Sequence, residues 1–339
     1  MMKKLLNTLY ITRQESYLHK ERETIIIKQG KDKLGQFPAI NISNILCFGQ
    51  VSVSPFLMGY CGEQGINLSF YTEYGKFLAR VQGRQSGNVL LRRAQYRWAD
   101  DNEKSVAIAR LMVAAKIANS RSILMREIRN HGENTLLKNA SKHLSASIRH
   151  VRHTKSVNEL IGVEGDAASH YFSVFNELLR GSEFSFNSRV RRPPTDPVNA
   201  LLSFAYTLIS NECSSALQGV GLDPYVGYLH QDRPGRTSLA QDLLEEFRAY
   251  WADRFVLTLI NRKQIQLKDF VIEASGAVRL TDGARKVFLT SWQKRKQTEV
   301  MHPYLDEQVP IGLLPHYQAM LLARHIRGDT EYYPPYLVK

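Results

Sequence analysis

Four side chains that could bind a divalent cation are spread over the middle of the sequence. Glu164 lies between two nearby glycines at the start of an apolar segment, where the lack of glycine side chains lets a ligand approach the backbone. His230 opens a polar loop after an apolar stretch, and Asp242 and Glu245 are three residues apart. On a helix, this spacing places both carboxylates on one face, a turn apart.

Together these residues would supply two or three carboxylates and an imidazole, a ligand set that suits Mg²⁺ or Mn²⁺ better than thiolate-bound zinc. Such a cation polarises a phosphodiester and orients an attacking hydroxyl, while arginine and lysine hold the strand backbone. Each residue also has a simpler explanation. A lone histidine is usually structural, and acids favour the solvated first turn of a helix. The residues alone leave both interpretations open.

The charge of the chain favours a polyanionic partner. It has 339 residues with 45 Lys and Arg against 32 Asp and Glu, a formal net charge of +13, and nucleic acid is the leading candidate for such a partner. Residues 134–158 contain no acidic residue. The basic side chains of this segment that we propose as a phosphate track are Lys138, Lys142, Arg149 and Arg152. An ordinary solvated helix face is the alternative.

The sequence does not suggest a membrane protein or an exported one. No apolar run approaches the roughly 18 residues of a spanning helix, and the first 13 residues lack an export signal. The three scattered cysteines, Cys47, Cys61 and Cys213, fit buried, reduced thiols rather than disulfides or a zinc cluster. We therefore expect a cytoplasmic protein.

The first part of the chain has the pattern of β-structure. Segments rich in β-branched and aromatic residues with partial alternation predict strands within 5–12, 17–28, 39–53 and 66–81. A short helix is expected between them, because Ser54 can cap it, Pro55 suits its first turn and Gly65 can end it.

From residue 88 onward the hydrophobic period becomes helical, with one hairpin expected near 270–280. The predicted helices lie within 103–131, 134–158, 197–217, 238–261, 282–294 and 315–327. The predicted fold class is therefore α+β, with a β-sandwich-like domain over 1–85, a linker and first helix over 86–102, and a mostly helical catalytic domain over 103–339.

Two motifs resemble a known family. The first is Gly-x-Glu-Gly-x-Ala-Ala around Glu164, and the second is the run Arg-Arg-Pro-Pro-x-Asp-Pro-x-Asn-Ala-Leu-Leu-Ser-Phe over 191–204. With His230 and the segment 238–248 around Glu245, they resemble the CRISPR-associated endonuclease and integrase that acquires new spacers, in the form found in type I, subtype C systems. The resemblance covers essentially the whole chain, and the long second motif makes a chance match very unlikely.

The resemblance implies a prokaryotic, metal-dependent DNA endonuclease and integrase. Glu164, His230 and Glu245 would be the metal ligands and Asp242 a nearby fourth acid of the catalytic site. Many family members have Asp where this chain has Glu245, a change that lengthens the ligand arm without changing its charge. The implied reaction is transesterification, in which the 3′-hydroxyl of a captured DNA fragment attacks a phosphodiester of the CRISPR repeat.

Several arginines flank these positions in the sequence and are candidates for binding DNA phosphates, although they could instead pair with carboxylates. They are Arg191, Arg192, Arg233, Arg236 and Arg248.

The resemblance also implies protein partners: a homodimer formed through the β domain, a small ferredoxin-like CRISPR-associated companion, and an iron–sulfur CRISPR-associated nuclease. Two other functions share parts of the sequence pattern, namely a metal-dependent branched-DNA nuclease of repair and a non-catalytic basic scaffold that binds DNA. The products formed on branched DNA would separate the three.

Overall fold

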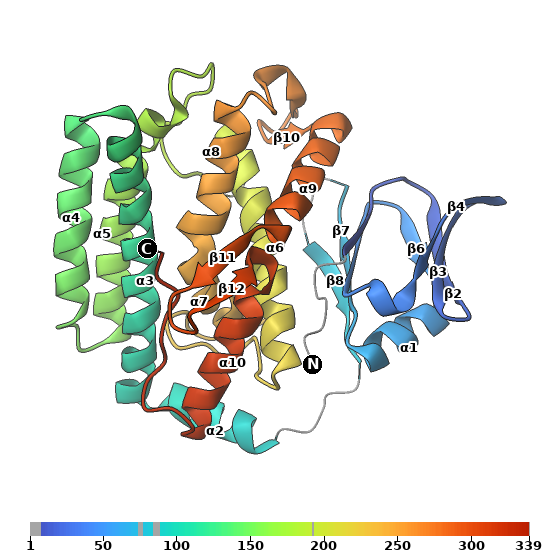
Figure 1. Cartoon of the computed structure of the whole chain (residues 1–339), viewed down its shortest axis with the longest axis horizontal. Helices are drawn as coiled ribbons and strands as arrows, with labels where there is room; N and C mark the ends of the chain where they lie inside the picture. The colour runs from blue at the N-terminus through green and yellow to red at the C-terminus, as the bar shows by residue number, and fades with distance from the viewer. Residues whose placement is uncertain (1–7, 74–76, 84–88, 192, 339) are drawn as a thin grey trace. The chain divides into compact units, whose positions relative to one another are not determined.

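The computed structural model describes residues 8–73, 77–83, 89–191 and 193–338. The chain divides into two compact units (Figure 1). The first comprises residues 1–87 together with 285–298, and the second comprises 88–284 together with 299–339. Residues 285–298 thus belong to the first unit, although they follow most of the second in the sequence.

Two four-stranded sheets form most of the first unit. One sheet has the order β1-β5-β7-β8, in which only β8 runs antiparallel to its neighbour. Its strands are Thr8–Ile11, Asn44–Phe48, Asn67–Tyr71 and Phe77–Val81. The other has the order β4-β3-β2-β6, and its strands are Asp32–Pro38, Thr24–Gln29, Ser16–Glu21 and Val51–Val53.

The β-structure predicted within 17–28 is confirmed, and it forms two strands, the hairpin of β2 and β3. Its turn contains Arg22 at a φ of +50°. A positive φ is uncommon for a residue other than glycine. The turn contains no glycine or asparagine, which are the residues that usually indicate such a turn in a sequence. The strand β4 that follows was also not predicted.

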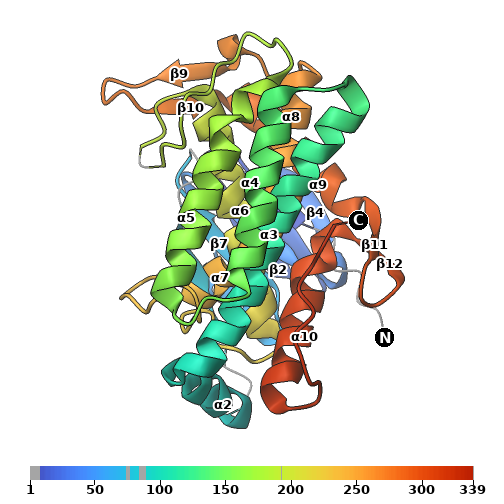
Figure 2. The same ribbon diagram turned by 90° about the vertical axis from the view of Figure 1, so that its left-hand side faces the viewer.

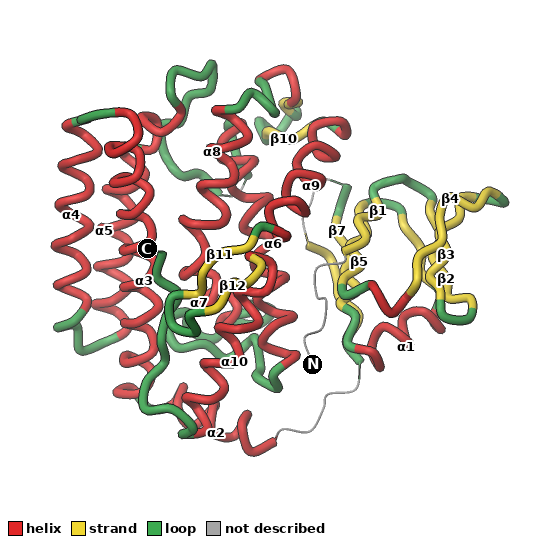
Figure 3. Tube along the Cα trace, viewed as in Figure 1, coloured by secondary structure: helices red, strands yellow, loops and turns green. Residues whose placement is uncertain are grey.

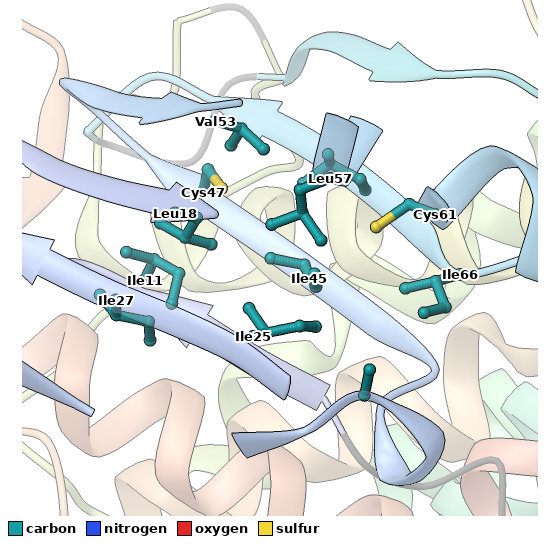
Figure 4. Packing of buried hydrophobic residues seen from close by; sticks show 12 residues of the cluster. Ile11, Leu18, Ile25, Ile27, Ile45, Cys47, Val53, Leu57, Cys61 and Ile66 are labelled. Carbon is teal, nitrogen blue, oxygen red and sulfur yellow. The ribbon is translucent and has the colours of Figure 1, made fainter. Parts of the chain in front are cut away.

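One hydrophobic core unites both sheets. Figure 4 shows side chains from β1, β2, β3, β5 and β6 meeting those of helix α1, Pro55–Gln64. The predicted limits of α1 are confirmed, since Ser54 Oγ accepts from Leu57 N and Gly65 ends the helix in a left-handed conformation. Cys47 and Cys61 lie in this core, and they and Cys213 are buried and free, as predicted.

Helix α9, Asp282–Gln297, supplies the returning segment of the first unit. Tyr10 Oη donates to Gln293 Oε1 at 3.3 Å, and Lys296 Nζ lies 3.4 Å from Thr8 Oγ1. Lys296 is fully buried. The end of this helix is therefore not fully solvated, because the Lys296 ammonium packs against β1.

Helices dominate the second unit, in which α3, α4 and α5 pack side by side (Figure 2). Its α-helices are α2 Val89–Asp100, α3 Asn102–His131, α4 Thr135–Val151, α5 Val157–Ser173, α6 Pro197–Gly219, α7 Ser238–Phe247, α8 Arg254–Asn261 and α10 Leu314–Arg327. A π-helical stretch, η3 Arg248–Asp253, joins α7 to α8. Short 3₁₀ helices are η1 Ala39–Asn41 in the first unit and η2 Phe175–Leu179, η4 Leu267–Asp269 and η5 Ile311–Leu313 in the second.

Figure 3 shows the mixed α+β class, with strands concentrated in the first unit, as predicted. The hairpin of β9 Phe270–Ile272 and β10 Val278–Leu280 is confirmed. A second hairpin, β11 Glu299–His302 and β12 Glu307–Pro310, was not predicted. Its strands are four residues long, too short for a clear alternation.

No helix within the described ranges is long and apolar enough to cross a membrane.

Candidate metal centre

Two of the predicted ligands meet at a lysine. The Lys116 ammonium on α3 lies 2.7 Å from Glu245 Oε2 on α7 and also contacts Glu164 Oε1 on α5. Helix α3 packs against both α5 and α7, which brings carboxylates distant in sequence to one point. Only 9% of the Lys116 side chain is exposed, so the two acids surround a cation away from bulk water.

Glu164 owes its position to the buried face of α5. Ser156 caps this helix through Glu159 N, and Leu160, Val163 and Ala167 are buried. Because Leu160 and Ala167 are a turn before and after Glu164, the carboxylate lies at the edge of that face, with 21% of its side chain exposed. Glu164 therefore lies in the middle of α5, not at the start of a helical segment as predicted.

Glu245 is bound by two cations. Its side chain is 3% exposed, and Oε1 lies 2.9 Å from Nη2 of Arg248 while Oε2 faces Lys116. Burial alone raises the pKa of Glu245, but Arg248, Lys116 and the nearby His230 outweigh burial and lower it to about 2. Glu245 is thus a carboxylate at neutral pH. The alternative of a solvated helix start is wrong for this acid, because the helix face is buried.

Asp242 orders the segment that carries His230. Its side chain is fully buried, and Oδ2 accepts from Tyr228 N at 2.6 Å and Leu229 N at 3.0 Å. Oδ1 accepts from His230 N at 3.0 Å and lies 2.6 Å from His230 Nδ1. With the proton on Nδ1, the lone pair is on Nε2, which is the arrangement that carboxylates impose on metal-binding histidines.

The loop before His230 passes very close to Asp242, and only glycine fits there. A Cβ built on Gly227 would lie 2.8 Å from both Asp242 Oδ2 and the carbonyl carbon of Ser238. We therefore expect Gly227→Ala to lower the free energy of unfolding by about 1–3 kcal/mol and to reduce activity by displacing His230. Chemical denaturation and a DNA strand-transfer assay would measure both effects.

A matched control is Gly59→Ala in helix α1, where nothing lies within 4 Å of the added Cβ. This change should raise stability by up to about 1 kcal/mol, because alanine favours helix interiors. A Gly227→Ala protein as stable and active as the unmodified chain would contradict the close approach of the Gly227 backbone to Asp242 and Ser238.

The single helix predicted over 238–261 is interrupted by η3, and π-helical turns are frequent at functional sites. Arg248 begins η3, and its guanidinium lies 4.6 Å from the centre of the Tyr206 ring. The Tyr206 hydroxyl in turn donates to Asp253 at 2.5 Å. Arg248 is 11% exposed and paired with Glu245. This supports a role in holding Glu245 rather than in contacting DNA.

The remaining predicted phosphate contacts lie mainly at the surface. Lys138, Lys142, Arg149 and Arg152 are exposed on or at the end of α4, and Arg191 and Arg233 are exposed in loops. Arg236 is half-buried. Arg192 lies outside the described residues. The α4 cluster is therefore a solvent-facing basic face, although Lys138 has a surface partner in Glu133 at 3.1 Å.

His230 also lines a cleft of about 610 Å³ in the second unit. Asn102, Asn158, Tyr96 and Asp232 are among its other lining residues. The imidazole is 22% exposed, so a substrate entering the cleft can reach it.

The predicted ligands do not form a complete metal cluster. Within the described parts of the chain, no group of three or more His, Cys, Asp or Glu side chains is arranged to bind a metal ion. Glu164 and Glu245 instead converge on Lys116, whereas His230 is held by Asp242. The role of Lys116 was not predicted. The signal was a charged residue inside the apolar stretch 111–118, because a buried lysine needs a partner.

The sequence of the chain matches known proteins over most of its length. A family model described as CRISPR associated protein Cas1 matches residues 9–294. A CRISPR-associated endonuclease Cas1 of Chlorobaculum tepidum is 51% identical, over 99% of each chain. A fusion of CRISPR-associated exonuclease Cas4 and endonuclease Cas1 from Geobacter sulfurreducens is 35% identical over 98% of this chain, which spans 60% of the fusion.

Solved structures share the fold. A Cas1 protein from Thermotoga maritima has a TM-score of 0.81 at 25% identity, covering 95% of this chain and 97% of that one. A casposase bound to its integration product has a TM-score of 0.84 at 24% identity, covering 96% and 92%. A chain of a Cas6-RT-Cas1–Cas2 complex has a TM-score of 0.83 at 22% identity, covering all of this chain and 37% of that one. Given the family match and the 51% identity over the full length, the chain belongs to the Cas1 family of CRISPR-associated proteins.

Proposed function

We propose that Glu164, His230 and Glu245 bind the divalent cation, Mg²⁺ or Mn²⁺, with which this Cas1 protein acts on DNA. The chain is a CRISPR-associated endonuclease and integrase by its family and by its 51% identity to a Cas1 endonuclease over the full length. The observation that carries the proposal is the Lys116 ammonium, which contacts carboxylate oxygens of both Glu164 and Glu245. Oxygen atoms from two helices thus already surround a positive charge.

The donor set fits a hard or borderline divalent cation, since carboxylate oxygens and imidazole nitrogen are its preferred ligands. Bound there, the cation would supply Lewis-acid polarisation of the scissile phosphate. His230 is oriented for ligation through Nε2, because its Nδ1 faces Asp242. In this proposal Asp242 positions His230 and does not contact the reacting atoms, since both of its oxygens accept backbone hydrogen bonds.

The proposed reaction is a transesterification. The 3′-hydroxyl of a captured DNA fragment attacks a phosphodiester of the CRISPR repeat, the new P–O bond replaces the old one, and the cut repeat strand leaves with a 3′-hydroxyl. The reaction occurs once on each strand. The exposed basic face of α4 and the loop arginines Arg191 and Arg233 are suited to hold the DNA backbone, which would make binding sensitive to salt.

We further propose a homodimer formed through the β domain, binding of the small ferredoxin-like companion, and contact with an iron–sulfur nuclease. One structural neighbour is a chain of a Cas6-RT-Cas1–Cas2 complex and one relative is a fusion with the exonuclease Cas4, which supports a companion protein and a nuclease as partners. We assign the chain to a type I, subtype C system on the resemblance of its motifs. The genes beside its own in the genome would test that assignment.

The test is strand rejoining on a branched DNA that mimics a half-integrated fragment. We expect the purified protein to release the branch and rejoin the flanking strand with Mn²⁺ or Mg²⁺, and EDTA to lower the rate at least about 10³-fold, because the phosphate loses its electrophilic activation. Gel analysis of labelled strands measures both products. Cleavage without rejoining would indicate a repair nuclease, and binding without chemistry in any metal would indicate a scaffold; either would overturn the proposal.

A further inference from the structure

Lys116 is the residue at the centre of the site to which neither the sequence motifs nor the proposed reaction gives a role. It lies on α3 with buried neighbours on either side, including Ala115 and Ile117. Its ammonium contacts Glu164 and lies 2.7 Å from Glu245. An ionised lysine in such surroundings is costly unless it is paired, and here both partners are the acids assigned to the metal.

The charges at this point balance without a metal. Glu164 and Glu245 contribute two negative charges, and Lys116 together with Arg248, which pairs with Glu245 at 2.9 Å, contributes two positive ones. The carboxylate oxygens of Asp242 have separate hydrogen-bond partners, namely three backbone amides and His230. Adding a divalent cation with Lys116 in place would bring a net excess of two positive charges into a buried site, where unbalanced charge is strongly unfavourable.

The Lys116 ammonium and a divalent cation would also compete for the same oxygen atoms. A cavity of about 10 Å³ adjoins the pair and is lined by Lys116, Glu164 and Ala168 among others, which is room for about one water molecule. The flexible lysine stem can move its terminal nitrogen, whereas Arg248 is held against the Tyr206 ring. Of the two cations, Lys116 is therefore the one able to leave.

We propose that Lys116 is the built-in counter-ion of the site, which stabilises Glu164 and Glu245 in the metal-free protein and is displaced when the divalent cation binds. Lys116 thereby sets the affinity for the metal. This inference rests on the proposed metal site at Glu164 and Glu245. It differs from a purely structural salt bridge, because a structural lysine would have no effect on metal affinity.

The experiment is calorimetric titration of Mn²⁺ into EDTA-treated, dialysed protein. Lys116→Met removes the charge and keeps the length of the side chain, and we expect it to bind Mn²⁺ at least about 10-fold more tightly, because no ion pairs are broken on binding. Its metal-free form should melt at a lower temperature than the unmodified protein, and Mn²⁺ should raise its melting temperature by a larger amount.

Two further variants keep the test decisive. Lys116→Gln retains hydrogen-bond donors and should also increase the affinity for Mn²⁺, so the test holds even if Lys116→Met fails to fold. Lys104→Met is the matched control, because Lys104 lies on the same helix with half of its side chain exposed, and it should leave Mn²⁺ affinity unchanged. Unchanged or weaker Mn²⁺ binding in the Lys116 variants would overturn the counter-ion role. Absence of Mn²⁺ binding and of metal-dependent rejoining in the unmodified protein would overturn the metal site itself.

Discussion

Glu164→Gln is expected to lower the rate of strand rejoining at least about 10³-fold with Mn²⁺ present, while leaving the fold intact. The amide keeps the size of the carboxylate and can still accept a hydrogen bond from Lys116. It lacks the negative charge that a divalent cation needs from its ligand, so the electrostatic stabilisation of the reacting phosphate is lost. Single-turnover rejoining of branched DNA measures the rate, and circular dichroism during heating measures the fold.

The control for this variant is Asp166→Asn, two residues further along α5. Asp166 is exposed and forms a surface pair with His170 at 3.7 Å, a kind of interaction worth little. It should rejoin DNA at the unmodified rate. A Glu164→Gln protein that retained more than about a tenth of the rate would remove Glu164 from the reaction.

Asp242→Asn is expected to destabilise the protein by about 3 kcal/mol and to lower the rejoining rate by about 10²-fold. Three backbone amides and His230 Nδ1 converge on this carboxylate. An asparagine has one acceptor oxygen in place of two, so its amide group would face N–H donors and leave at least one buried donor unpaired. Because the carboxylate also orients the imidazole, the loss extends to activity.

Urea denaturation and single-turnover rejoining would measure the two effects of Asp242→Asn. Asp32→Asn serves as the control, since Asp32 is exposed at the start of β4 in the first unit, and it should change neither quantity. A stable Asp242→Asn protein with normal activity would show that the hydrogen bonds of Asp242 are dispensable and that His230 is oriented by other means.

Local signals predicted the parts of the fold that depend on few residues. Ser54 and Gly65, for example, delimit α1. Such caps need only residues within one turn. The change from alternating to helical periodicity near residue 88 likewise identified the α+β class. Resemblance, rather than periodicity, led to Glu164, His230 and Glu245 being proposed as the metal ligands.

The features that were missed depend on contacts between distant parts of the chain. The carboxylates of Glu164 and Glu245 meet only because both helices pack on α3 at Lys116. The two oxygens of Asp242 could not be assigned to backbone amides 12 to 14 residues earlier from spacing alone. Residues 285–298 join the first unit through packing that leaves no local pattern.

Charge counting had a similar limit. The excess of basic residues drew attention to α4, whose candidates are exposed. The count of basic residues could not separate the exposed α4 residues from Arg248, which is buried and paired with Glu245. Only three-dimensional contacts distinguish an arginine available to DNA phosphates from one that holds a carboxylate in place.

The most direct measurement is the anomalous diffraction signal of Mn²⁺ in crystals of the purified protein. The metal site proposed here predicts one strong peak within about 2.5 Å of carboxylate oxygens of Glu164 and Glu245 and of Nε2 of His230, with the Lys116 ammonium moved away. A peak bound by other side chains, or no peak in crystals of protein that rejoins DNA with Mn²⁺, would contradict it.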